Sequence, residues 1–288
     1  MGKQCKTNGC YISINCLEHM KLSIITINYN NKDGLQKTID SVICQTWKDY
    51  EWIIIDGGST DGSKELIEQY QQHFAYWCSE PDKGVYNAMN KGIAKAKGEY
   101  IQFLNSGDCF HQVNTLEMVS VYLGQNADVF YGDLNYLSVN DNYIIHYPKK
   151  LTMHYFLSHS IGHPASYIKA ELLKSAGYRE DFKIVSDWFR FVEWFREGRV
   201  FRHMNVVVAD YDTTGISSVN LDLISKENEI VYNELFGCEN RKWIEESQKM
   251  QYFYEDVDKC GFLPIRKHGG RRLSLLLWVI RMLNKTLK

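Results

Sequence analysis

Proline is scarce in this chain, with four residues among 288, and the 20 glycines leave no room for a long low-complexity linker. Hydrophobic residues make up 44% of the sequence and charged residues 24%, so enough apolar material is present to bury a core. These values exclude disordered, collagen-like and small disulfide-stapled proteins. The length predicts one large domain, or one domain with an appendage.

The eight cysteines include no C-x-x-C pair and no Cys/His cluster at zinc spacing. This pattern favours a reduced setting over a disulfide framework or a zinc site. No run of residues reaches the roughly 18 apolar positions of a membrane-spanning helix, and the first 20 residues are too weakly apolar for a signal peptide. We therefore expect a cytoplasmic protein with a loose leader over residues 1–19.

The net charge of −2 hides an asymmetry along the chain. Eight of the 33 Lys and Arg residues lie within residues 259–288, which contain no Asp or Glu. Residues 1–258 therefore carry 25 basic against 35 acidic side chains, a net −10, which argues against nucleic acid as the main partner. The basic residues of 266–288 flank an apolar centre, a composition typical of helices that lie on an anionic membrane surface. A helix that docks on the acidic body is the alternative.

Apolar strands alternate with helical patterns in the first part of the chain. Residues 21–28, 52–55 and 100–104 each predict a buried strand, and helical spacing of apolar residues follows the first two. Strands that are apolar throughout indicate a parallel sheet covered on both faces, and ligands of such sheets bind at the carboxyl ends of the strands. Shorter strands follow from about residue 128, and residues 220–258 predict charged helices.

Polar residues cluster where these strands end. The first strand runs into Asn28-Tyr29-Asn30, the second into the loop Asp56–Gly62, and a later one into Asn105–Asp108. Because these ends share one edge of the sheet, we expect the three loops to converge on one crevice.

Two carboxylates at this edge could carry chemistry. Asp108 could hold a divalent cation, which would neutralise a nucleotide diphosphate; its alternative role is to cap a helix that begins near Gln112. Asp56 could accept a hydrogen bond from the N–H of a base such as uracil, and the two glycines after it allow a ligand close to the backbone. Its alternative role is that of a turn residue in an Asp-Gly loop.

Four segments within residues 21–110 stand out by their order and spacing. They are Ser23–Asn30 (SIITINYN), Ile53–Gly62 (IIIDGGSTDG), Asn87–Ile93 (NAMNKGI) and Gly98–Asp108 (GEYIQFLNSGD). Together they resemble glycosyltransferase family 2, and they look closest to bacterial capsule, colanic-acid and lipopolysaccharide transferases. The resemblance implies a GT-A fold, which is an α/β architecture with a Rossmann-like mixed sheet flanked by helices. It also implies a nucleoside-diphosphate sugar donor, Mn²⁺ or Mg²⁺ as cofactor, and inversion at the anomeric carbon.

The resemblance implies roles for individual positions, with Asp108 as the metal ligand. Many family members have a second Asp where Gly57 stands, and another where Asn105 or Gly107 stands. A single protein carboxylate would then hold the metal together with the diphosphate and water, so we expect low metal affinity without donor. The positions implied to bind substrate are Asn28, Tyr29, Asn30, Asp56, Gly84, Asn90, Asn105 and His163.

The second half resembles the family less tightly. The acceptor side of the family is resembled by His163–Tyr167, followed by Glu171–Leu173 and by Gly177 and Tyr178. Ile184–Arg190 resembles the family's motif with an Asp at the head of a helix, which implies that Asp187 is the general base. An acceptor hydroxyl has a pKa far above neutrality, so inverting transfer needs a carboxylate to take its proton as the new bond forms. Ser186 and Asp187 as an ordinary N-cap is the alternative.

The remaining features have structural alternatives. The spacing of His154, His159 and His163 is mixed, which favours scattered structural histidines over a metal site. The aromatic helix around residues 188–195 predicts core packing, with a lipid-facing surface as the alternative. Residues 213–218 resemble a family loop that closes over the donor and excludes water.

We interpret the chain as a leader (1–19), a GT-A catalytic domain (20–218, with a nucleotide-sugar half to 110 and an acceptor half from 111) and a helical extension (219–288). The expected activity is metal-assisted inverting transfer of a sugar, most simply from a UDP-sugar, to a hydroxyl of a surface polysaccharide or a lipid-linked glycan precursor. The departures at Gly57, Asn105 and Gly107 keep a second hypothesis open, a non-catalytic nucleotide- or glycan-binding scaffold subunit. A Rossmann oxidoreductase is disfavoured because no G-x-G-x-x-G follows the first strand.

Overall fold

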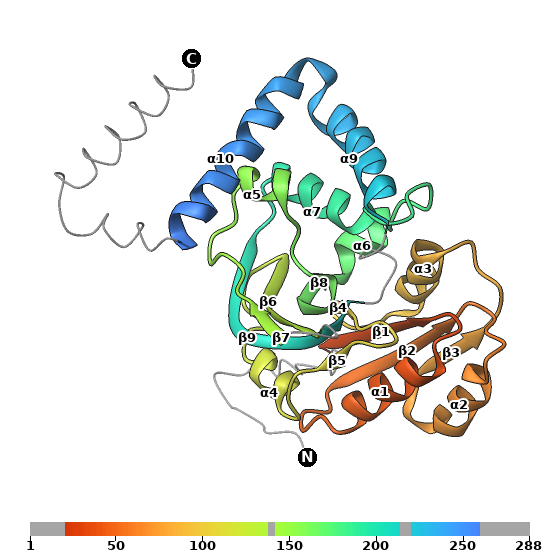
Figure 1. The fold of residues 1–288 in the computed structure, drawn as a ribbon. Helices are drawn as coiled ribbons and strands as arrows, with labels where there is room; N and C mark the ends of the chain where they lie inside the picture. The colour runs from red at the N-terminus through yellow and green to blue at the C-terminus, as the bar shows by residue number, and fades with distance from the viewer. Residues whose placement is uncertain (1–20, 138–141, 214–219, 260–288) are drawn as a thin grey trace, which may run out of the picture. The chain divides into compact units, whose positions relative to one another are not determined.

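The computed structural model describes residues 21–137, 142–213 and 220–259 (Figure 1). The predicted leader (1–19), most of the predicted closing loop (213–218) and the predicted membrane-contacting tail (266–288) lie outside the described residues. Among the helices of the described part, none is long and apolar enough to cross a membrane.

The first part of the chain alternates strands and helices, as the apolar pattern predicts. Four strands in this part pair in parallel, and three of them are almost entirely buried. Figure 1 shows α1 and α2 on one side of these strands and α3 on the other. The elements are β1 (Leu22–Asn28), α1 (Lys32–Ile43), β2 (Tyr50–Asp56), α2 (Ser63–Tyr70), η1 (Gln71–His73), β3 (Tyr76–Ser79), α3 (Val85–Lys95) and β4 (Tyr100–Phe103).

The second part extends the same sheet with strands of mixed direction. The sheet has the order β3-β2-β1-β4-β8-β6-β9-β5, and β7 pairs with β6 beside this path. β8 runs antiparallel to β4 and β6, whereas β6 and β9 run parallel. The elements are β5 (Cys109–Phe110), α4 (Thr115–Ser120), β6 (Val129–Leu137), β7 (Asn142–Ile145), η2 (His163–Ala165), β8 (Ser166–Lys169), α6 (Ala170–Ala176), α7 (Ser186–Arg196) and β9 (Phe201–Asp212).

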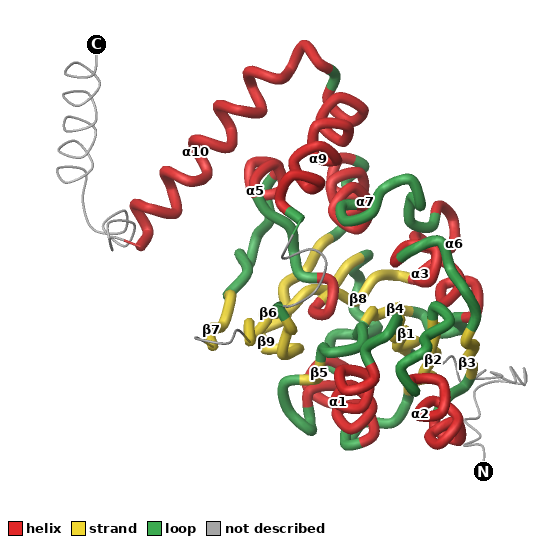
Figure 2. The backbone as a smooth tube through the Cα atoms, turned by 45° about the vertical axis from the view of Figure 1, so that its right-hand side comes forward, coloured by secondary structure: helices red, strands yellow, loops and turns green. Residues whose placement is uncertain are grey.

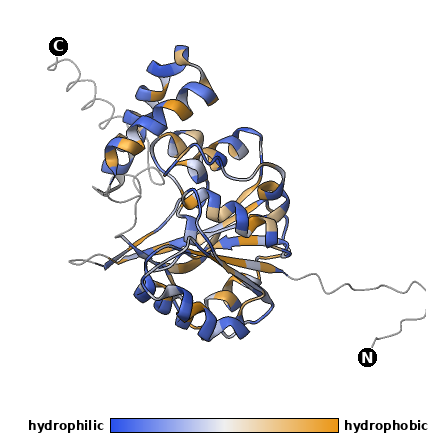
Figure 3. Cartoon of the chain, turned by 90° about the vertical axis from the view of Figure 1, so that its right-hand side faces the viewer, coloured by the Kyte–Doolittle hydropathy of each residue, from blue (hydrophilic) through white to orange (hydrophobic). Residues whose placement is uncertain are grey.

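This topology confirms the mixed sheet that the family resemblance implies. The apolar strands alone suggest a sheet that is parallel throughout. This holds only for the first four strands, β1 to β4. The hydrophobic colour of Figure 3 runs along the strands, where the core of the sheet is buried. The helix expected near Gln112 begins instead at Thr115 with Asn114 at its cap position, so the capping role considered for Asp108 is wrong.

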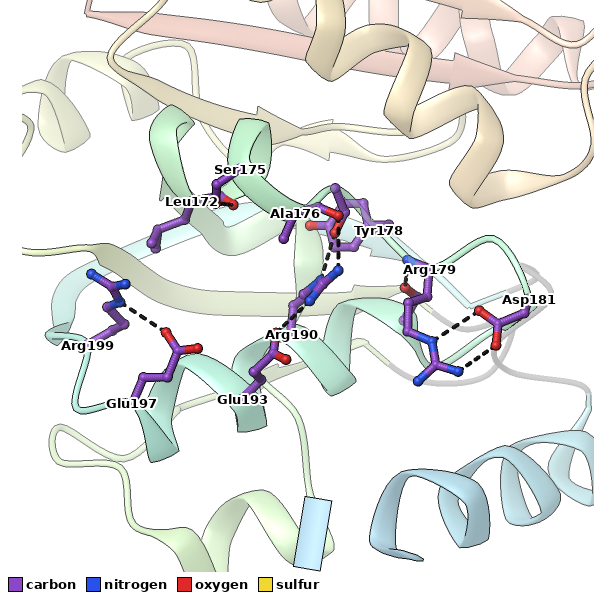
Figure 4. A network of polar contacts seen from close by, with 12 residues as sticks. Leu172, Ser175, Ala176, Tyr178, Arg179, Asp181, Arg190, Glu193, Glu197 and Arg199 are labelled. Carbon is purple, nitrogen blue, oxygen red and sulfur yellow. Dashed lines mark hydrogen bonds and ion pairs between the residues drawn. The ribbon is translucent and has the colours of Figure 1, made fainter. Parts of the chain in front are cut away.

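Helix α7 is a core helix. Trp188, Phe191 and Trp194 are among its buried side chains, which confirms core packing and not a lipid-facing surface. Arg190 ties α7 to the end of α6, because its guanidinium donates to the carbonyl oxygens of Gly177 (2.7 Å) and Ala176 (3.0 Å), as Figure 4 shows.

The chain divides into two compact units. The first comprises residues 1–150 and 161–227 and contains the sheet; the second comprises residues 151–160 and 228–288. Within the second unit, α5 (Met153–Ser158) packs on α10 (Arg241–Lys259), and the amide of Gln248 donates to the carbonyl oxygen of Leu157 at 2.7 Å. Figure 2 shows α9 (Leu221–Phe236) leading into α10 as consecutive helices, joined by η3 (Cys238–Asn240).

Candidate active site

The ends of β1 and β2 form a tightly bonded pair of loops. Asn28 and Asp56 are register partners at the last positions of these strands, and the Asn28 amide donates to Asp56 Oδ1 at 2.7 Å. Asp56 also accepts bonds from the hydroxyls of Ser59 (2.5 Å) and Ser79 (2.6 Å) and from the backbone N–H groups of Gly58 and Ser59. Burial alone would raise the pKa of Asp56, but these hydrogen bonds outweigh it and lower the pKa, so the side chain is a carboxylate.

The loop after β1 is held against the loop after β2 by Asn30. Its backbone N–H donates to the Ser59 hydroxyl at 2.8 Å, and its side-chain oxygen accepts from the Thr60 N–H at 2.8 Å. Asn30 has φ of 48°, a left-handed conformation that Asn adopts more readily than most residues. Tyr29, beside it, is 66% exposed. The structure therefore brings Asn28, Tyr29, Asn30 and Asp56 together.

A neighbouring loop carries Asp82, an acidic residue that the sequence pattern does not single out. A Cβ on Gly57 would lie 2.5 Å from a carboxylate oxygen of Asp82, so Asp82 occupies the space where a side chain at 57 would project. Asp82 also accepts a hydrogen bond from the Gly84 N–H at 2.8 Å, which places Gly84, at the cap of α3, beside this carboxylate.

Asn90 joins α3 to the acceptor-side segment. Its amide donates to the Tyr178 carbonyl oxygen at 2.8 Å and accepts from the Tyr178 N–H at 2.8 Å. A second donor bond reaches Glu180 at 3.0 Å. These bonds fix the position of the chain near Tyr178, so Asn90 has a structural role in the fold; its predicted contact with substrate stays a prediction.

Asp108 lies in the loop between β4 and β5, where it is buried with 5% of its surface exposed. Burial raises its pKa to about 8, with a further increase from the charge of Asp212, although the backbone N–H groups of Asp212 and Asn105 oppose the shift. The Asp212 N–H donates to Asp108 Oδ1 at 3.1 Å. A second carboxylate therefore accompanies Asp108, although the sequence analysis expects only one.

The donors around Asp108 suit a hard divalent cation. A Cβ on Gly107 would lie 3.2 Å from Asp212 Oδ2, so the Asp212 carboxylate reaches the loop that carries Asp108. The buried side-chain oxygen of Asn105, in the same loop, has no hydrogen-bond partner among the described residues. Oxygen ligands of this kind fit Mg²⁺ or Mn²⁺. In the described part of the chain, no group of three or more His, Cys, Asp or Glu is placed to hold a metal ion.

Asp187 lies in the first turn of α7 with 20% of its side chain exposed. The N-cap of this helix is Val185 and no side chain caps it, while the Ser186 hydroxyl accepts a bond from the Arg179 N–H at 2.7 Å. The N-cap alternative for Ser186 and Asp187 is therefore wrong. The Asp187 carboxylate is therefore not engaged in capping the helix.

Tyr86, a side chain that the family segments do not include, lies beside Asp187. The buried Tyr86 hydroxyl lies 2.9 Å from Asp187 Oδ1 and 2.5 Å from the Ile184 carbonyl oxygen, and it accepts from the Ser186 N–H at 3.0 Å. Burial raises the Tyr86 pKa well above its usual value, and the charge of Asp187 adds to the shift. Tyr86 therefore keeps its single proton and shares it between two acceptors.

His163 faces the other oxygen of Asp187. Its Nδ1 lies 3.8 Å from Asp187 Oδ2, too far for a hydrogen bond, and its Nε2 lies 2.8 Å from the Tyr178 hydroxyl. Burial lowers the pKa of His163, although the charge of Asp187 opposes this, so the ring is neutral near pH 7. His154 and His159 belong to the second unit, whereas His163 belongs to the first.

A buried carboxylate on α9 fixes the loop that leads into α7. Glu227 is 5% exposed and accepts bonds from the N–H groups of Lys183 (2.7 Å), Ile184 (3.0 Å) and Val185 (3.2 Å). Three hydrogen bonds to this one buried side chain hold the backbone just before Asp187. Nothing in the spacing of Glu227, 40 residues after Asp187, signals this role.

Comparison with known proteins gives the family. The family model "Glycosyl transferase family 2" matches residues 23–195, which include Asn28, Asp56, Asp108 and Asp187. The chain belongs to glycosyltransferase family 2. It is a glycosyltransferase, and the oxidoreductase alternative is wrong.

Relatives of this glycosyltransferase act in, or are assigned to, sugar transfer. An uncharacterized glycosyltransferase of Mycobacterium tuberculosis is 34% identical over 206 residues, which cover 68% of this chain and 77% of the relative. A PGL/p-HBAD biosynthesis glycosyltransferase of Mycobacterium bovis is 29% identical over 200 residues, covering 67% and 77%.

Solved structures confirm the GT-A fold of this glycosyltransferase. S. aureus TarS 1–349 in complex with UDP-GlcNAc has a TM-score of 0.61 at 16% identity, covering 79% of this chain and 71% of that one. The alignment with the UDP complex of TarS spans 60% of that chain. The mannosyltransferase PcManGT from Pyrobaculum calidifontis, in complex with GDP-Man and Mn²⁺, has a TM-score of 0.56 at 14% identity, covering 91% and 80%.

Proposed function

We propose that this glycosyltransferase moves a sugar, with inversion, from a UDP-sugar to a hydroxyl of a surface polysaccharide or a lipid-linked glycan precursor. The observation that carries the proposal is the setting of Asp187. Its carboxylate is partly exposed, one oxygen is oriented by Tyr86, and the other has no hydrogen bond to His163. A carboxylate held in this way can accept a proton from an acceptor.

The donor binds, in this proposal, at the loops after β1 and β2. Asn28, Tyr29 and Asn30 contact the nucleotide, with the exposed Tyr29 ring against the base. Asp56 is fully buried, and its two oxygens already accept five protein hydrogen bonds, so it anchors this platform from below. The UDP and UDP-GlcNAc complexes of TarS support a uridine nucleotide.

Asp108 and Asp212 would hold Mg²⁺ or Mn²⁺, and the side-chain oxygen of Asn105 is a further candidate ligand. When bound, such an ion neutralises negative charge on a leaving diphosphate. The Mn²⁺ complex of PcManGT supports a metal-assisted reaction.

The acceptor hydroxyl attacks the anomeric carbon from the face opposite the diphosphate. The new carbon–oxygen bond forms while the bond between the anomeric carbon and the diphosphate oxygen breaks, and the bonding pair leaves with the nucleotide. The hydroxyl proton passes to Asp187 Oδ2. Tyr86 and Glu227 keep the carboxylate in place, and positioning of this kind is a main contribution of protein groups to group transfer.

Thermal unfolding with UDP, GDP, CDP and dTDP, each with and without Mn²⁺, tests the donor assignment. A ligand at 100 times its dissociation constant stabilises a protein by about 2.7 kcal/mol. The proposal expects UDP to give the largest increase in melting temperature, and only with metal. If no nucleotide raises the melting temperature of the wild type, the UDP-sugar donor and its dependence on metal are refuted.

A further inference from the structure

Three tyrosines form a continuous row across neighbouring strands. In the strand register, Tyr136 of β6 lies opposite Tyr143 of β7 on one side and Tyr211 of β9 on the other. The Tyr136 and Tyr143 rings stack, with centroids 5.5 Å apart and planes 21° apart. The centroid of Tyr211 lies 5.0 Å from that of Tyr136.

The tyrosine row lies on the face of the sheet that carries Asp108. Cys109 of β5 pairs with Asp210 of β9 in antiparallel register, and this register, continued by one residue beyond β5, sets Asp108 opposite Tyr211. Residues opposite each other in neighbouring strands project to the same face. The charge of Asp108 also reaches Tyr136, since it contributes, after burial, to raising the Tyr136 pKa to about 12.

The segment of His163 covers the inner end of the same face. Leu134 stands two residues before Tyr136 and therefore shares its face. A Cβ on Gly162 would lie 2.1 Å from Leu134 Cδ1, which shows how closely the segment that begins η2 approaches β6 here. The segment just before His163 therefore contacts β6 two residues from Tyr136.

Exposure increases outward along the row. Tyr136 and Tyr211 are partly buried, whereas Tyr143 is 53% exposed. A tyrosine ring carries partial negative charge on its face, and the C–H groups on the face of a pyranose ring carry partial positive charge. Tyrosine also loses little conformational entropy on binding, and its hydroxyl can bond to sugar hydroxyls.

We infer that Tyr211, Tyr136 and Tyr143 form a stacking platform for a pyranose ring of the acceptor. The acceptor is therefore itself a glycan, bound through a sugar ring next to the one that carries the reacting hydroxyl. This inference rests on the proposed function, because that function places the acceptor on the Asp108 and Asp187 side of the sheet.

Saturation-transfer NMR tests the platform with the methyl glycosides of glucose, galactose, mannose, rhamnose and N-acetylglucosamine, each titrated in the presence of UDP and Mn²⁺. At least one glycoside should bind the wild type. Tyr143→Ala should weaken that binding about 2- to 10-fold, the range expected for loss of one aromatic contact, and Tyr143→Phe should retain it. Tyr252→Ala is the matched control, since Tyr252 is 51% exposed and makes one ring contact with His159 at 5.7 Å.

Binding of no glycoside to the wild type would overturn the platform, as would equal affinities of the wild type and Tyr143→Ala. An equal loss in Tyr252→Ala would also overturn it. The UDP-induced shift in melting temperature, measured on the same samples, separates the two ideas. A UDP shift without glycoside binding refutes the platform alone, whereas Tyr143-dependent glycoside binding without any nucleotide shift supports the platform and refutes the proposed donor.

Discussion

The backbone N–H of Asp212 donates a hydrogen bond of 3.1 Å to the carboxylate of Asp108, so two acidic residues that are 104 positions apart meet at one edge of the sheet. Asp108 ends the loop after β4, and Asp212 ends β9, which pairs with β5 directly after that loop. The pairing of β5 with β9 therefore builds a two-carboxylate edge that neither segment contains by itself. Asp108 is buried and Asp212 is partly buried, and the charge of Asp212 contributes to raising the pKa of Asp108.

Asp212→Asn should weaken metal binding without removing the nucleotide platform. We expect the Mn²⁺ concentration for a half-maximal UDP-induced shift in melting temperature to rise at least about 10-fold, because one anionic ligand becomes a neutral amide. Asp210→Asn is the control, since Asp210 bonds to His111 at 2.6 Å and Asn135 at 2.9 Å. An unchanged Mn²⁺ requirement in Asp212→Asn would leave Asp108 as a lone protein ligand.

Tyr86→Phe should lower turnover more than donor affinity. The substitution removes the hydroxyl that orients Asp187, and it leaves the Ser186 N–H without its acceptor, which costs about 1 to 3 kcal/mol of unfolding free energy. The measurement is a comparison of kcat and KM for UDP release from a UDP-sugar.

Tyr131→Phe is the control for this loss of stability, because the Tyr131 hydroxyl is also bonded to a backbone carbonyl, that of Pro148 at 2.6 Å. It should lose stability and keep its turnover. Equal turnover in the two variants would mean that Tyr86 has only a structural role.

Glu227→Gln should disturb the position of the Asp187 carboxylate, because Glu227 holds the backbone that precedes it. A glutamine has one acceptor oxygen in place of two and turns an NH₂ group toward the three N–H donors of residues 183–185, so we expect about 1 to 3 kcal/mol of destabilisation and slower UDP release. Glu229→Gln on the same helix changes only a partly exposed ion pair with Arg241, which is worth about 0 to 1 kcal/mol. Similar turnover in both variants would refute a positioning role for Glu227.

The stability of the fold should depend on His163 in acid. Burial lowers the pKa of His163 in the folded state below its usual value of about 6.5, so the unfolded chain binds a proton first as the pH falls through about 6.5. The contribution of His163 is therefore present above that pH and is lost below it. Urea unfolding at pH 7.5 and pH 5 should show a smaller loss of stability in His163→Gln than in the wild type, and parallel losses would contradict this assignment.

The sequence predicts the elements of the first half of the fold. Its strands are short apolar runs, and each of its helices repeats apolar residues at helical spacing. The polar loops after β1 and β2 also converge as predicted, since parallel strands place their carboxyl ends at one edge. The direction of β8 could not be predicted this way, because short buried strands have the same composition in either orientation.

The sequence pattern does not predict the residues that reach the site through contacts between distant parts of the chain. Asp212 lies beside Asp108 only because β9 pairs with β5, and Glu227 meets the loop before α7 from a helix that follows β9. Tyr86 lies one residue before a family segment, and no local spacing connects it to Asp187, 101 residues later. The tyrosine row needs the register of three strands, which the alternation of residues in any one strand cannot supply.

The most direct test of the central claim is the rate of UDP release from UDP-glucose, UDP-galactose and UDP-GlcNAc by the wild type and Asp187→Asn, with Mn²⁺ and with water as acceptor. The wild type should hydrolyse at least one donor above background. The hydrolysis rate of Asp187→Asn should be at least about 100-fold lower, because the amide cannot take the proton of the attacking hydroxyl. The variant should keep the UDP-induced shift in melting temperature. If Asp187→Asn hydrolysed that donor as fast as the wild type, Asp187 would not be the general base.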